Sequence, residues 1–289
     1  MRILIATLAG LLTSPALVAE PLFWQANKGA LTYYIFGSVH VGDESMYPLP
    51  NKVTNKLQES DGLIIEADIR NTQGISYPPI TLLSKDVLTN KHKDELKGIA
   101  TLLELNSDQL LNSPPWAAAL AIQMKQIEYL GYQAEKGVDT HLMNKASLRD
   151  TQIISLESLQ SQIDLLTGQA QSGKELLVSA IEEFDHSEDA TRCLIKSWQA
   201  GDLDKLIEFS SLTEMSPEFE QSFLIDRNLN WVKQLASPDW SKGNKGSYMM
   251  VVGTLHLIGE HSVIELLKQD GFAVKQLSES KQAFCEFQY

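Results

Sequence analysis

Two similar phrases near opposite ends of the chain constrain its fold more than any other feature. Each is a run of apolar and β-favouring residues that closes on Gly-x-x-His: GSVH at 37–40 and GTLH at 253–256. The apolar run predicts a strand inside a sheet, and the glycine lets the backbone turn at its end. His40 and His256 are then left at the carboxyl ends of two strands.

These two histidines predict a shared site. In α/β proteins, ligands and catalytic groups collect at the carboxyl edge of the sheet, and imidazole is a common metal ligand. The simplest interpretation is one metal site that draws its ligands from both ends of the chain. A histidine at a strand end is also often a hydrogen-bonded structural residue, so the Gly-x-x-His spacing alone leaves both interpretations open.

The rest of the chain supplies further strands and a long helical middle. Strands are expected at 21–25, 31–36, 63–66, 151–156 (buried), 247–252 and 272–277, with a hairpin turn at 27–29. Helices are expected at 52–60, 80–130 with a break at 114–115, 137–147, 158–235 with several breaks, and 262–270. This order predicts an α/β fold: a central mixed β-sheet built from the N- and C-terminal segments, flanked by helices and with a helical middle region. We expect residues 20–289 to form a single domain.

The amino terminus has the pattern of a secretory signal peptide. Arg2 is followed by an apolar run over 3–12 and then by a segment that ends at Ala19. We therefore expect residues 1–19 to be removed, with cleavage after Ala16 as the alternative. The run is shorter than the roughly 20 residues that a membrane span needs, and no later segment is long and apolar enough. The protein is expected to be periplasmic or secreted, without stable membrane insertion after cleavage; a short buried helix or a membrane anchor is the alternative.

Composition argues against one class of binding partner but does not show whether the two cysteines form a disulfide. The net charge of −13 argues against nucleic acid, because binding phosphates needs clustered Lys and Arg. Cys193 and Cys285 are the two cysteines. In an exported chain they could form one disulfide, or they could be two buried thiols. They are too few and too distant to make a thiolate metal site alone.

Two glutamates end apolar strands and could join the histidines. Glu66 closes one short apolar run, and Glu157 follows another at 153–156. A carboxylate there could be a ligand for Zn, Mn, Co or Fe, or a general base acting on metal-bound water. A solvated charge or a contact at the start of a helix is the structural alternative, and it suits Glu157 beside Ser158. The compact HExxH, GxSxG and GxxxxGK[ST] motifs are absent.

Several further phrases accompany the two histidines in a fixed order. They are PLP at 48–50, EAD at 66–68, KGVDTHL at 136–142, LESLQSQ at 156–162, SWQAGDL at 197–203, DRN at 226–228, VGTLHLIG at 252–259 and GFAV at 271–274. Together with FGSVHV at 36–41, they resemble the TraB/GumN family, which includes the Tiki proteases, over nearly the whole chain after the signal region.

The resemblance implies an α/β fold, shared more distantly with erythromycin-esterase-like and ChaN-like proteins. It also implies a divalent-metal-dependent hydrolase, with peptidase activity in the Tiki branch. On this resemblance, His40, Glu66 and His256 would hold a divalent transition metal (Mn, Co, Zn or Fe) and leave one position open for water or substrate. Glu157 would be a fourth ligand or the general base. The bond attacked would be a peptide or amide bond, in a peptide or small-molecule substrate.

The resemblance also implies catalytic roles for Arg227 and Asn228. Arg227 would lock a carboxylate by a bidentate pair or steady a developing oxyanion, and Asn228 would orient it; a structural helix contact is the alternative. Asp139, near a helix start, is interpreted as a cap, with a supporting role beside a metal ligand as the alternative. The other histidines, His92, His141, His186 and His261, are interpreted as surface or structural residues, and of these only His261 is near enough to His256 to suggest a substrate-side role.

Two other functions remain open on the same scaffold. ChaN-like relatives bind haem, so a haem- or metal-binding protein is the first alternative. Sequestration of a signalling peptide without cleavage, as suggested by the pheromone-shutdown relatives, is the second. Metal content and peptide cleavage would separate these from the hydrolase.

Overall fold

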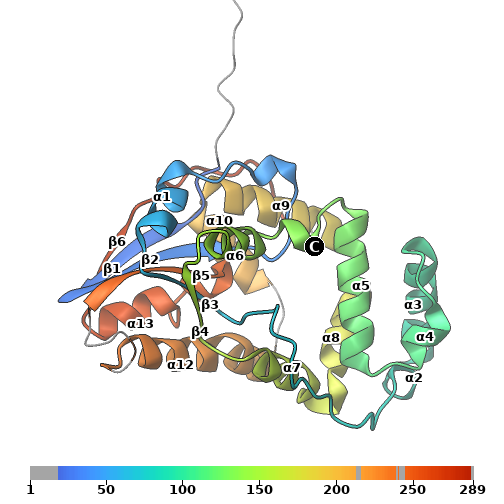
Figure 1. Ribbon diagram of the computed structural model, residues 1–289. Coiled ribbons are helices and arrows are strands. Elements are labelled where there is room, and N and C mark those ends of the chain that lie inside the picture. The colour runs from blue at the N-terminus through green and yellow to red at the C-terminus, as the bar shows by residue number, and fades with distance from the viewer. Residues whose placement is uncertain (1–18, 213–215, 239, 241–244, 288–289) are drawn as a thin grey trace, which may run out of the picture.

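A six-stranded mixed sheet forms the centre of the protein (Figure 1). The computed structural model describes residues 19–212, 216–238, 240 and 245–287. The strands are β1 (Phe23–Lys28), β2 (Ala30–Ser38), β3 (Gly62–Ile65), β4 (Gln152–Ser155), β5 (Lys245–Gly253) and β6 (Ala273–Gln276), in the spatial order β4-β3-β5-β2-β1-β6. β1 is antiparallel to both its neighbours, and the other pairs are parallel. Strand β5, from the C-terminal part of the chain, lies between β2 and β3, which confirms the predicted mixed sheet built from both ends of the chain.

The pairing of β5 with its neighbours brings the two Gly-x-x-His phrases to one edge. Ser38 of β2 pairs with Gly253 of β5 in parallel register. On the other side of β5, Ile65 of β3 pairs with Val251. His40, Glu66 and His256 therefore follow three neighbouring parallel strands at their carboxyl ends, where polar groups of α/β proteins collect.

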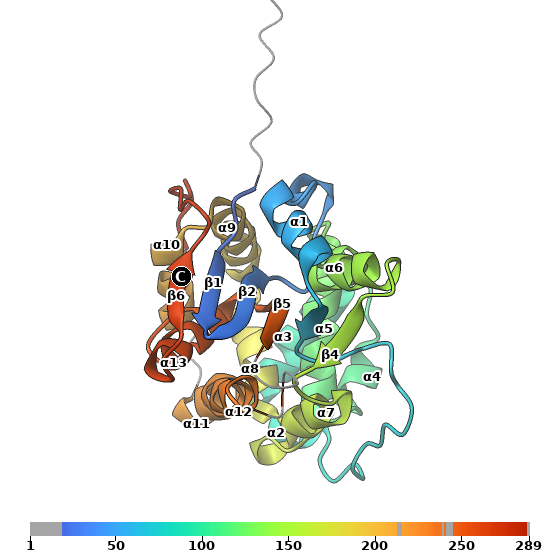
Figure 2. The ribbon, with the colours of Figure 1, turned by 60° about the vertical axis from the view of Figure 1, so that its left-hand side comes forward.

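Helices cover both faces of the sheet and continue beyond its carboxyl edge (Figures 1 and 2). They are α1 (Asn51–Glu59), α2 (Ser84–Val87), α3 (Asn90–Leu102), α4 (Ser107–Leu111), α5 (Pro115–Tyr129), α6 (Val138–Ser147), α7 (Leu159–Thr167), α8 (Lys174–Glu182), α9 (Ser187–Ala200), α10 (Leu203–Leu212), α11 (Pro217–Glu220), α12 (Asp226–Leu235) and α13 (Val263–Gln269). A π-helix, η4 (Gln221–Ile225), joins α11 to α12, and a 3-10 turn, η5 (Thr254–Leu257), follows β5.

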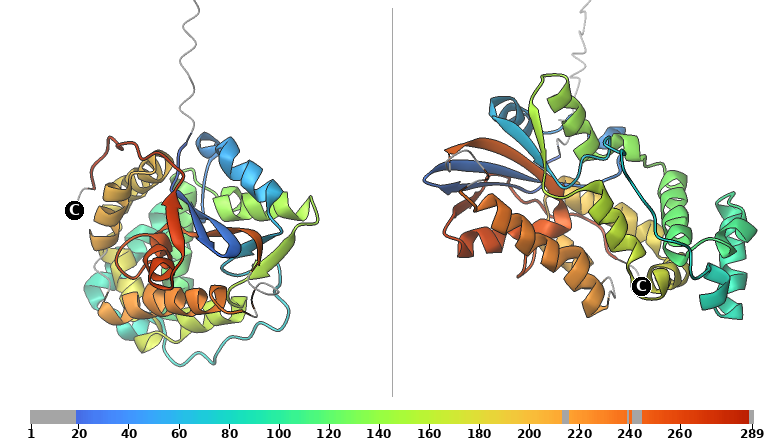
Figure 3. Two further views of the ribbon diagram at one scale, coloured as in Figure 1. Left: turned by 90° about the vertical axis from the view of Figure 1, so that its left-hand side faces the viewer. Right: turned by 60° about the horizontal axis from the view of Figure 1, so that its bottom comes forward.

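Alternation along the strands separates two cores. Met250 and Val252 of β5 pack on the side of α10, α12 and α13, whereas Met249 and Val251 pack on the side of α1, α6 and α9. A third core joins α3, α4, α5 and α8, and this group of helices lies beyond the end of the sheet where β2 and β5 finish (Figures 1 and 3). The central strands are thus buried on both faces, which accounts for their nearly continuous apolar sequences.

One strand prediction is wrong in its burial. The segment 151–156 contains β4, but β4 is one of the two edge strands of the sheet, and its one partner among the described strands is β3. Gln152 and Ser155 are exposed, and the two isoleucines between them are half-buried. Two adjacent isoleucines indicate a strand but do not show whether a second strand covers its outer edge.

A disulfide fastens the C-terminal tail to α9. Cys193 of α9 is bonded to Cys285, 92 residues later, so the disulfide is present and the alternative of two buried thiols is excluded. The tail is held further by the Ala283 N–H, which donates to Asp202 Oδ2 at 2.7 Å, and by the Lys281 N–H, which donates to the Ala200 carbonyl at 2.9 Å. These contacts fix the end of the chain on the helix that covers β2.

The predicted signal peptide falls almost wholly outside the described residues, which begin at Ala19. The cleavage site and the export of the protein therefore stay predictions. Over the part of the chain that the structure describes, no helix is both long and apolar enough to span a bilayer.

Candidate active site

Three of the predicted site residues converge on Gly253, the last residue of β5. A side-chain Cβ at Gly253 would lie 3.3 Å from Glu66 Oε1, 3.6 Å from His256 Cδ2 and 3.7 Å from His40 Nε2. Glu66 and His256 are buried, whereas 62% of the His40 side chain is exposed. The absence of a side chain at Gly253 leaves the room in which the three predicted ligands meet.

The first glycine of the other phrase allows the two strand ends to touch. A Cβ at Gly37 would lie only 2.7 Å from Thr254 Oγ1, closer than real Cβ contacts, so a larger residue would push the strand ends apart. The same Thr254 hydroxyl donates a hydrogen bond to the Ser38 carbonyl at 3.0 Å, and both residues are buried. Each Gly-x-x-His phrase therefore packs directly against the other.

Helix α6 orients His40. Gly137 packs so closely on the His40 carbonyl that a Cβ there would overlap it, and the Val138 N–H donates to the Val39 carbonyl at 2.9 Å. Asp139 Oδ2 lies 3.2 Å from His40 Nδ1. Desolvation lowers the pKa of His40, but the hydrogen bond that its Nδ1–H donates to Asp139 and the charge of Glu66 outweigh it and raise the pKa to about 9.

The interpretation of Asp139 as a helix cap is wrong. The residue at the N-cap of α6 is Gly137, and no side chain caps this helix. Asp139 lies in the first turn instead and turns toward His40. A sequence pattern that places an acid near a helix start fits both roles, and only the docking of α6 on the end of β2 selects the second.

His256 is fixed by α12. Its Nδ1 lies 2.7 Å from Asn228 Oδ1, and its Nε2 lies 3.1 Å from Arg227 Nη1. A guanidinium can only donate, so Nε2 accepts and the proton of a neutral imidazole is on Nδ1. Burial is the main cause that lowers the pKa of His256, to about 4. The prediction that Asn228 orients Arg227 is therefore wrong, because its amide oxygen holds His256.

Arg227 uses all five of its N–H donors. Nε donates to Glu157 Oε2 at 3.2 Å, and Nη2 donates to Glu157 Oε1 at 2.6 Å and to Glu66 Oε2 at 2.7 Å. Nη1 donates to His256 Nε2 and to the Phe223 carbonyl at 3.0 Å. The predicted bidentate pair with a carboxylate is confirmed, and the acid that receives it is Glu157.

Glu157 is saturated with donors. Besides Arg227, Gln162 Nε2 donates to its Oε1 at 2.8 Å, and the indole N–H of Trp231 donates to its Oε2 at 3.3 Å. The carboxylate thus receives four hydrogen bonds from three side chains. This environment is that of an anchor for Arg227, with no oxygen left free to bind a metal or accept a proton from water.

Glu66 stays ionised in the centre of the cluster. Burial raises its pKa, but the charges of the nearby histidines and of Arg227, with the Gly253 N–H that donates to Oε1 at 2.7 Å, lower it to about 2. Its Oε2 is bonded to Arg227. Oε1 faces the imidazoles, 4.0 Å from His256 Nε2.

The donor chemistry of these residues fits a transition metal. Both imidazoles are tied through Nδ1, to Asp139 and Asn228, which is how proteins commonly orient histidine ligands so that Nε2 can bind an ion. Glu66 Oε1 supplies an anionic oxygen beside them. As the side chains stand, however, no three His, Cys, Asp or Glu residues of the described segments are close enough together to hold an ion, and Arg227 occupies the His256 lone pair.

Sequence reasoning missed Trp231. Its ring is fully buried, and the ring centroid lies 4.5 Å from that of His256. The same centroid lies 4.8 Å from the guanidinium carbon of Arg227. A tryptophan on an apolar helix face normally indicates core packing. Its position four residues after Arg227, on the same helix face, was the one available signal.

The remaining histidines lie outside this cluster, in agreement with their structural interpretation. His92 pairs with Glu182 at 3.0 Å, and His141 packs on the Tyr47 ring at 4.5 Å. His261 contributes its backbone carbonyl, which accepts from Asn228 Nδ2 at 2.9 Å. It therefore steadies Asn228 through the main chain.

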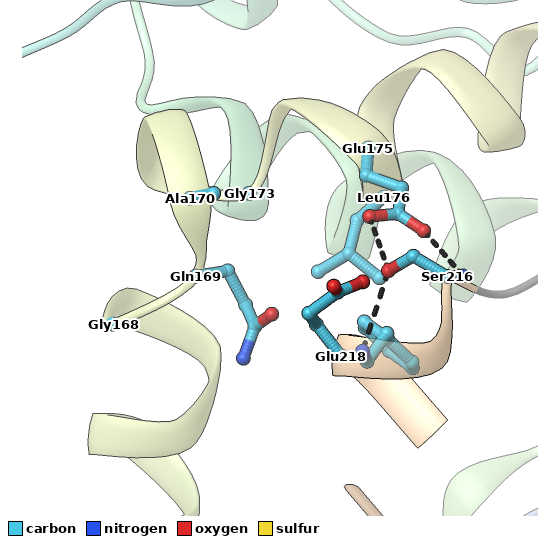
Figure 4. A pocket seen from close by; sticks show the side chains of 9 residues that line it. Gly168, Gln169, Ala170, Gly173, Glu175, Leu176, Ser216 and Glu218 are labelled. Atoms are coloured by element: carbon cyan, nitrogen blue, oxygen red, sulfur yellow. Dashed lines mark hydrogen bonds between the residues drawn. The ribbon is translucent and has the colours of Figure 1, made fainter. Parts of the chain in front are cut away.

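A cavity of about 300 Å³ lies between the segment 168–173 that follows α7, the start of α8, and α11, away from the predicted site residues (Figure 4). Gln169 and Glu218 extend into it from opposite sides. Glu175 accepts hydrogen bonds from the N–H and the hydroxyl of Ser216, at 2.8 and 2.9 Å. None of the residues proposed as ligands or catalysts lines this cavity.

Comparison with known proteins agrees with the resemblance. The model of the TraB/PrgY/gumN family matches residues 22–276. The Escherichia coli (strain K12) protein "Uncharacterized protein YbaP" is 27% identical over 239 residues, 82% of this chain and 88% of its own length. A Treponema pallidum (strain Nichols) protein, "Uncharacterized protein", is 22% identical over 164 residues, 53% of this chain and 49% of its own. No solved structure matches significantly. The chain belongs to the TraB/PrgY/gumN family.

Proposed function

We propose that this protein is an exported, metal-dependent hydrolase that cleaves peptide or amide bonds. His40, Glu66 and His256 would hold a divalent transition metal. One observation carries the proposal: two imidazoles from opposite ends of the chain, each held through Nδ1, lie beside Oε1 of an ionised, buried Glu66. Three such donors leave a position open for water or substrate, as in catalytic metal sites.

The protein's own residues would orient and balance this site. A bound metal would polarise the scissile carbonyl and lower the pKa of a water molecule. Asp139 and Asn228 hold the two imidazoles in position, and Arg227 supplies positive charge beside Glu66. Glu157 fixes Arg227 through two parallel hydrogen bonds, so we assign it that role rather than the role of fourth ligand or general base.

The proposed location is the periplasm or the exterior of the cell. The disulfide between Cys193 and Cys285 supports it, because disulfides persist in oxidising compartments and are rare in the cytosol. The signal-like sequence before Glu20 supports it independently.

Elemental analysis and peptide cleavage test the proposal together. The purified protein is expected to contain stoichiometric Zn, Mn, Co or Fe and to cleave members of a diverse peptide library. A His40→Ala, His256→Ala double variant should lose both the metal and the activity. His92→Ala is the matched control, because this histidine pairs with Glu182 instead and should leave both unchanged.

The same experiment separates the alternative functions. A protein that contains metal in the wild type but cleaves no peptide would indicate sequestration of a ligand instead of hydrolysis. A metal-free protein with a haem absorbance band would overturn the hydrolase in favour of a haem binder.

A further inference from the structure

Arg227 contacts two of the three proposed metal ligands. Its Nη2 donates to Glu66 Oε2 at 2.7 Å, and its Nη1 donates to His256 Nε2 at 3.1 Å. The second contact uses the imidazole lone pair that a metal ion would need. A guanidinium and a metal ion therefore cannot both use His256 at the same time.

We propose that Arg227 is a built-in cation that competes with the metal for Glu66 and His256 and so sets the metal affinity of the site. This inference rests on the proposed function, since it concerns the same ligands. The guanidinium pairs with both buried carboxylates. A metal ion on His256 would have to displace Arg227 from the imidazole lone pair.

Charge balance explains why a competing cation is needed. Glu66 and Glu157 are both buried, with side chains 10% and 11% exposed. Two buried carboxylates without a counter-charge would strongly destabilise the fold. The guanidinium supplies one positive charge, 2.7 Å from Glu66 Oε2 and 2.6 Å from Glu157 Oε1. Arg227 is therefore the counter-charge that both carboxylates share.

The other contacts of Arg227 involve no metal ligand. Both hydrogen bonds to Glu157 and the one to the Phe223 carbonyl could persist when His256 is released. Phe223 lies in the π-helix η4, and its carbonyl accepts from Arg227, four residues later. π-helical turns are often found at functional sites. The Trp231 ring, 4.8 Å from the guanidinium carbon, limits how far Arg227 can move.

Metal titration of an Arg227 variant tests the competition directly. Arg227→Met keeps most of the side-chain length but removes the charge and all five donors. We expect its dissociation constant for Zn²⁺ or Mn²⁺, measured by competition with a chromophoric chelator, to be about tenfold lower or more, since a positive charge beside the ligands is gone. We also expect a lower melting temperature than wild type in chelator, and a larger rise when metal is added.

Two further variants make the titration decisive. Arg192→Met removes an exposed arginine that pairs with Glu188 at 3.0 Å, and its metal affinity should equal that of the wild type. Arg227→Lys keeps a positive charge at the site, so its affinity should stay closer to the wild type than that of Arg227→Met. It also guards against an Arg227→Met variant that does not fold, because the charge balance of the cluster is retained.

The outcomes separate this inference from the proposed function. A folded Arg227→Met that binds metal as weakly as the wild type, or more weakly, would overturn the competition and leave the metal site standing. Metal binding by Arg227→Met but not by the wild type would support the competition and refute the wild-type metalloenzyme. If neither protein binds any of the metals, both proposals fail.

Discussion

At the scale of single residues, the site depends on how each polar atom is occupied. Asn228 and Asp139 hold the Nδ1 atoms of the two histidines, and this leaves Nε2 as the atom that can act. His256 is buried and neutral, whereas Glu66 is buried and ionised. Burial is the main reason that His256 is neutral, and the charge of Arg227 adds to it. Arg227 also helps the nearby histidines to keep Glu66 ionised.

The pH dependence of stability should report the buried state of His256. Its pKa is about 4 in the folded protein, against 6.5 for an ordinary histidine. Between about pH 6.5 and pH 4, His256 binds a proton in the unfolded chain but not in the folded protein. The free energy of unfolding therefore falls as the pH falls through this range, and the stabilisation from neutral His256 is fully present above about pH 6.5. The shift corresponds to roughly 3 kcal/mol. Urea unfolding in chelator should show this fall, and His256→Gln should reduce it over the same pH window. An identical pH profile for both proteins would contradict the assignment.

Asn228→Leu should disturb the site by removing the contacts of Asn228 with His256 Nδ1 and with the His261 carbonyl. The substitution removes the acceptor of the buried Nδ1–H, at a cost of about 1–3 kcal/mol in the free energy of unfolding. Metal affinity should fall as well, because the orientation of the imidazole is lost. Chelator competition and urea unfolding measure the two effects. Asn228→Asp, which restores an acceptor, should recover metal binding better than Asn228→Leu; equal affinities would argue against an orienting role.

At the scale of secondary-structure elements, the site is a meeting of strand ends with α6 and α12. The β2–β5 contact sets the distance between the histidines, through Gly37 and Thr254. Trp198 of α9 also holds the end of β2 in place, because its indole N–H donates to the Gly37 carbonyl at 2.9 Å. α9 in turn is fixed by the disulfide to the C-terminal tail.

Gly37→Ala should destabilise the protein by forcing β2 away from Thr254. Overpacking of this kind typically costs about 1–3 kcal/mol. Thr254→Ala removes the obstructing hydroxyl, so the double variant should be more stable than the sum of the two single effects predicts. Urea unfolding of the wild type, the two single variants and the double variant completes a double-mutant cycle. Strict additivity would mean that the two strand ends do not press on each other.

Reduction of the disulfide should loosen the C-terminal tail and α9. Removing a disulfide typically costs 2–5 kcal/mol in small secreted domains, and we expect about 2 kcal/mol or more here. The readout is the midpoint of urea unfolding with and without reductant. The Cys193→Ser, Cys285→Ser double variant is the control and should be insensitive to reductant. If reductant leaves the wild-type midpoint unchanged, the tail does not support the fold.

At the scale of the whole molecule, the sequence was sufficient to predict which strand ends meet at the site, but not which of its side chains contact one another. The repeated Gly-x-x-His phrase and the apolar runs before it were sufficient to predict that β2 and β5 end together, because parallel strands share a carboxyl edge. Glu66 followed from the same rule. The order of family phrases then pointed to Arg227 and Asn228.

Contacts that depend on helix rotation could not be predicted. Asn228 of α12 contacts His256 of η5, and Asp139 faces His40 because Gly137 lets α6 approach the backbone. Neither contact is encoded in local spacing. The pairing of Cys193 with Cys285 likewise depends on the path of a tail without regular structure.

The central claim is that one site, assembled from both ends of the chain, uses His40 and His256 together. X-ray absorption spectroscopy of the metal-loaded protein tests it most directly. We expect two imidazole nitrogens at roughly 2.0–2.2 Å from the metal, reduced to one by His40→Ala and to one by His256→Ala. A coordination shell of oxygen atoms only, unchanged by either substitution, would contradict the account.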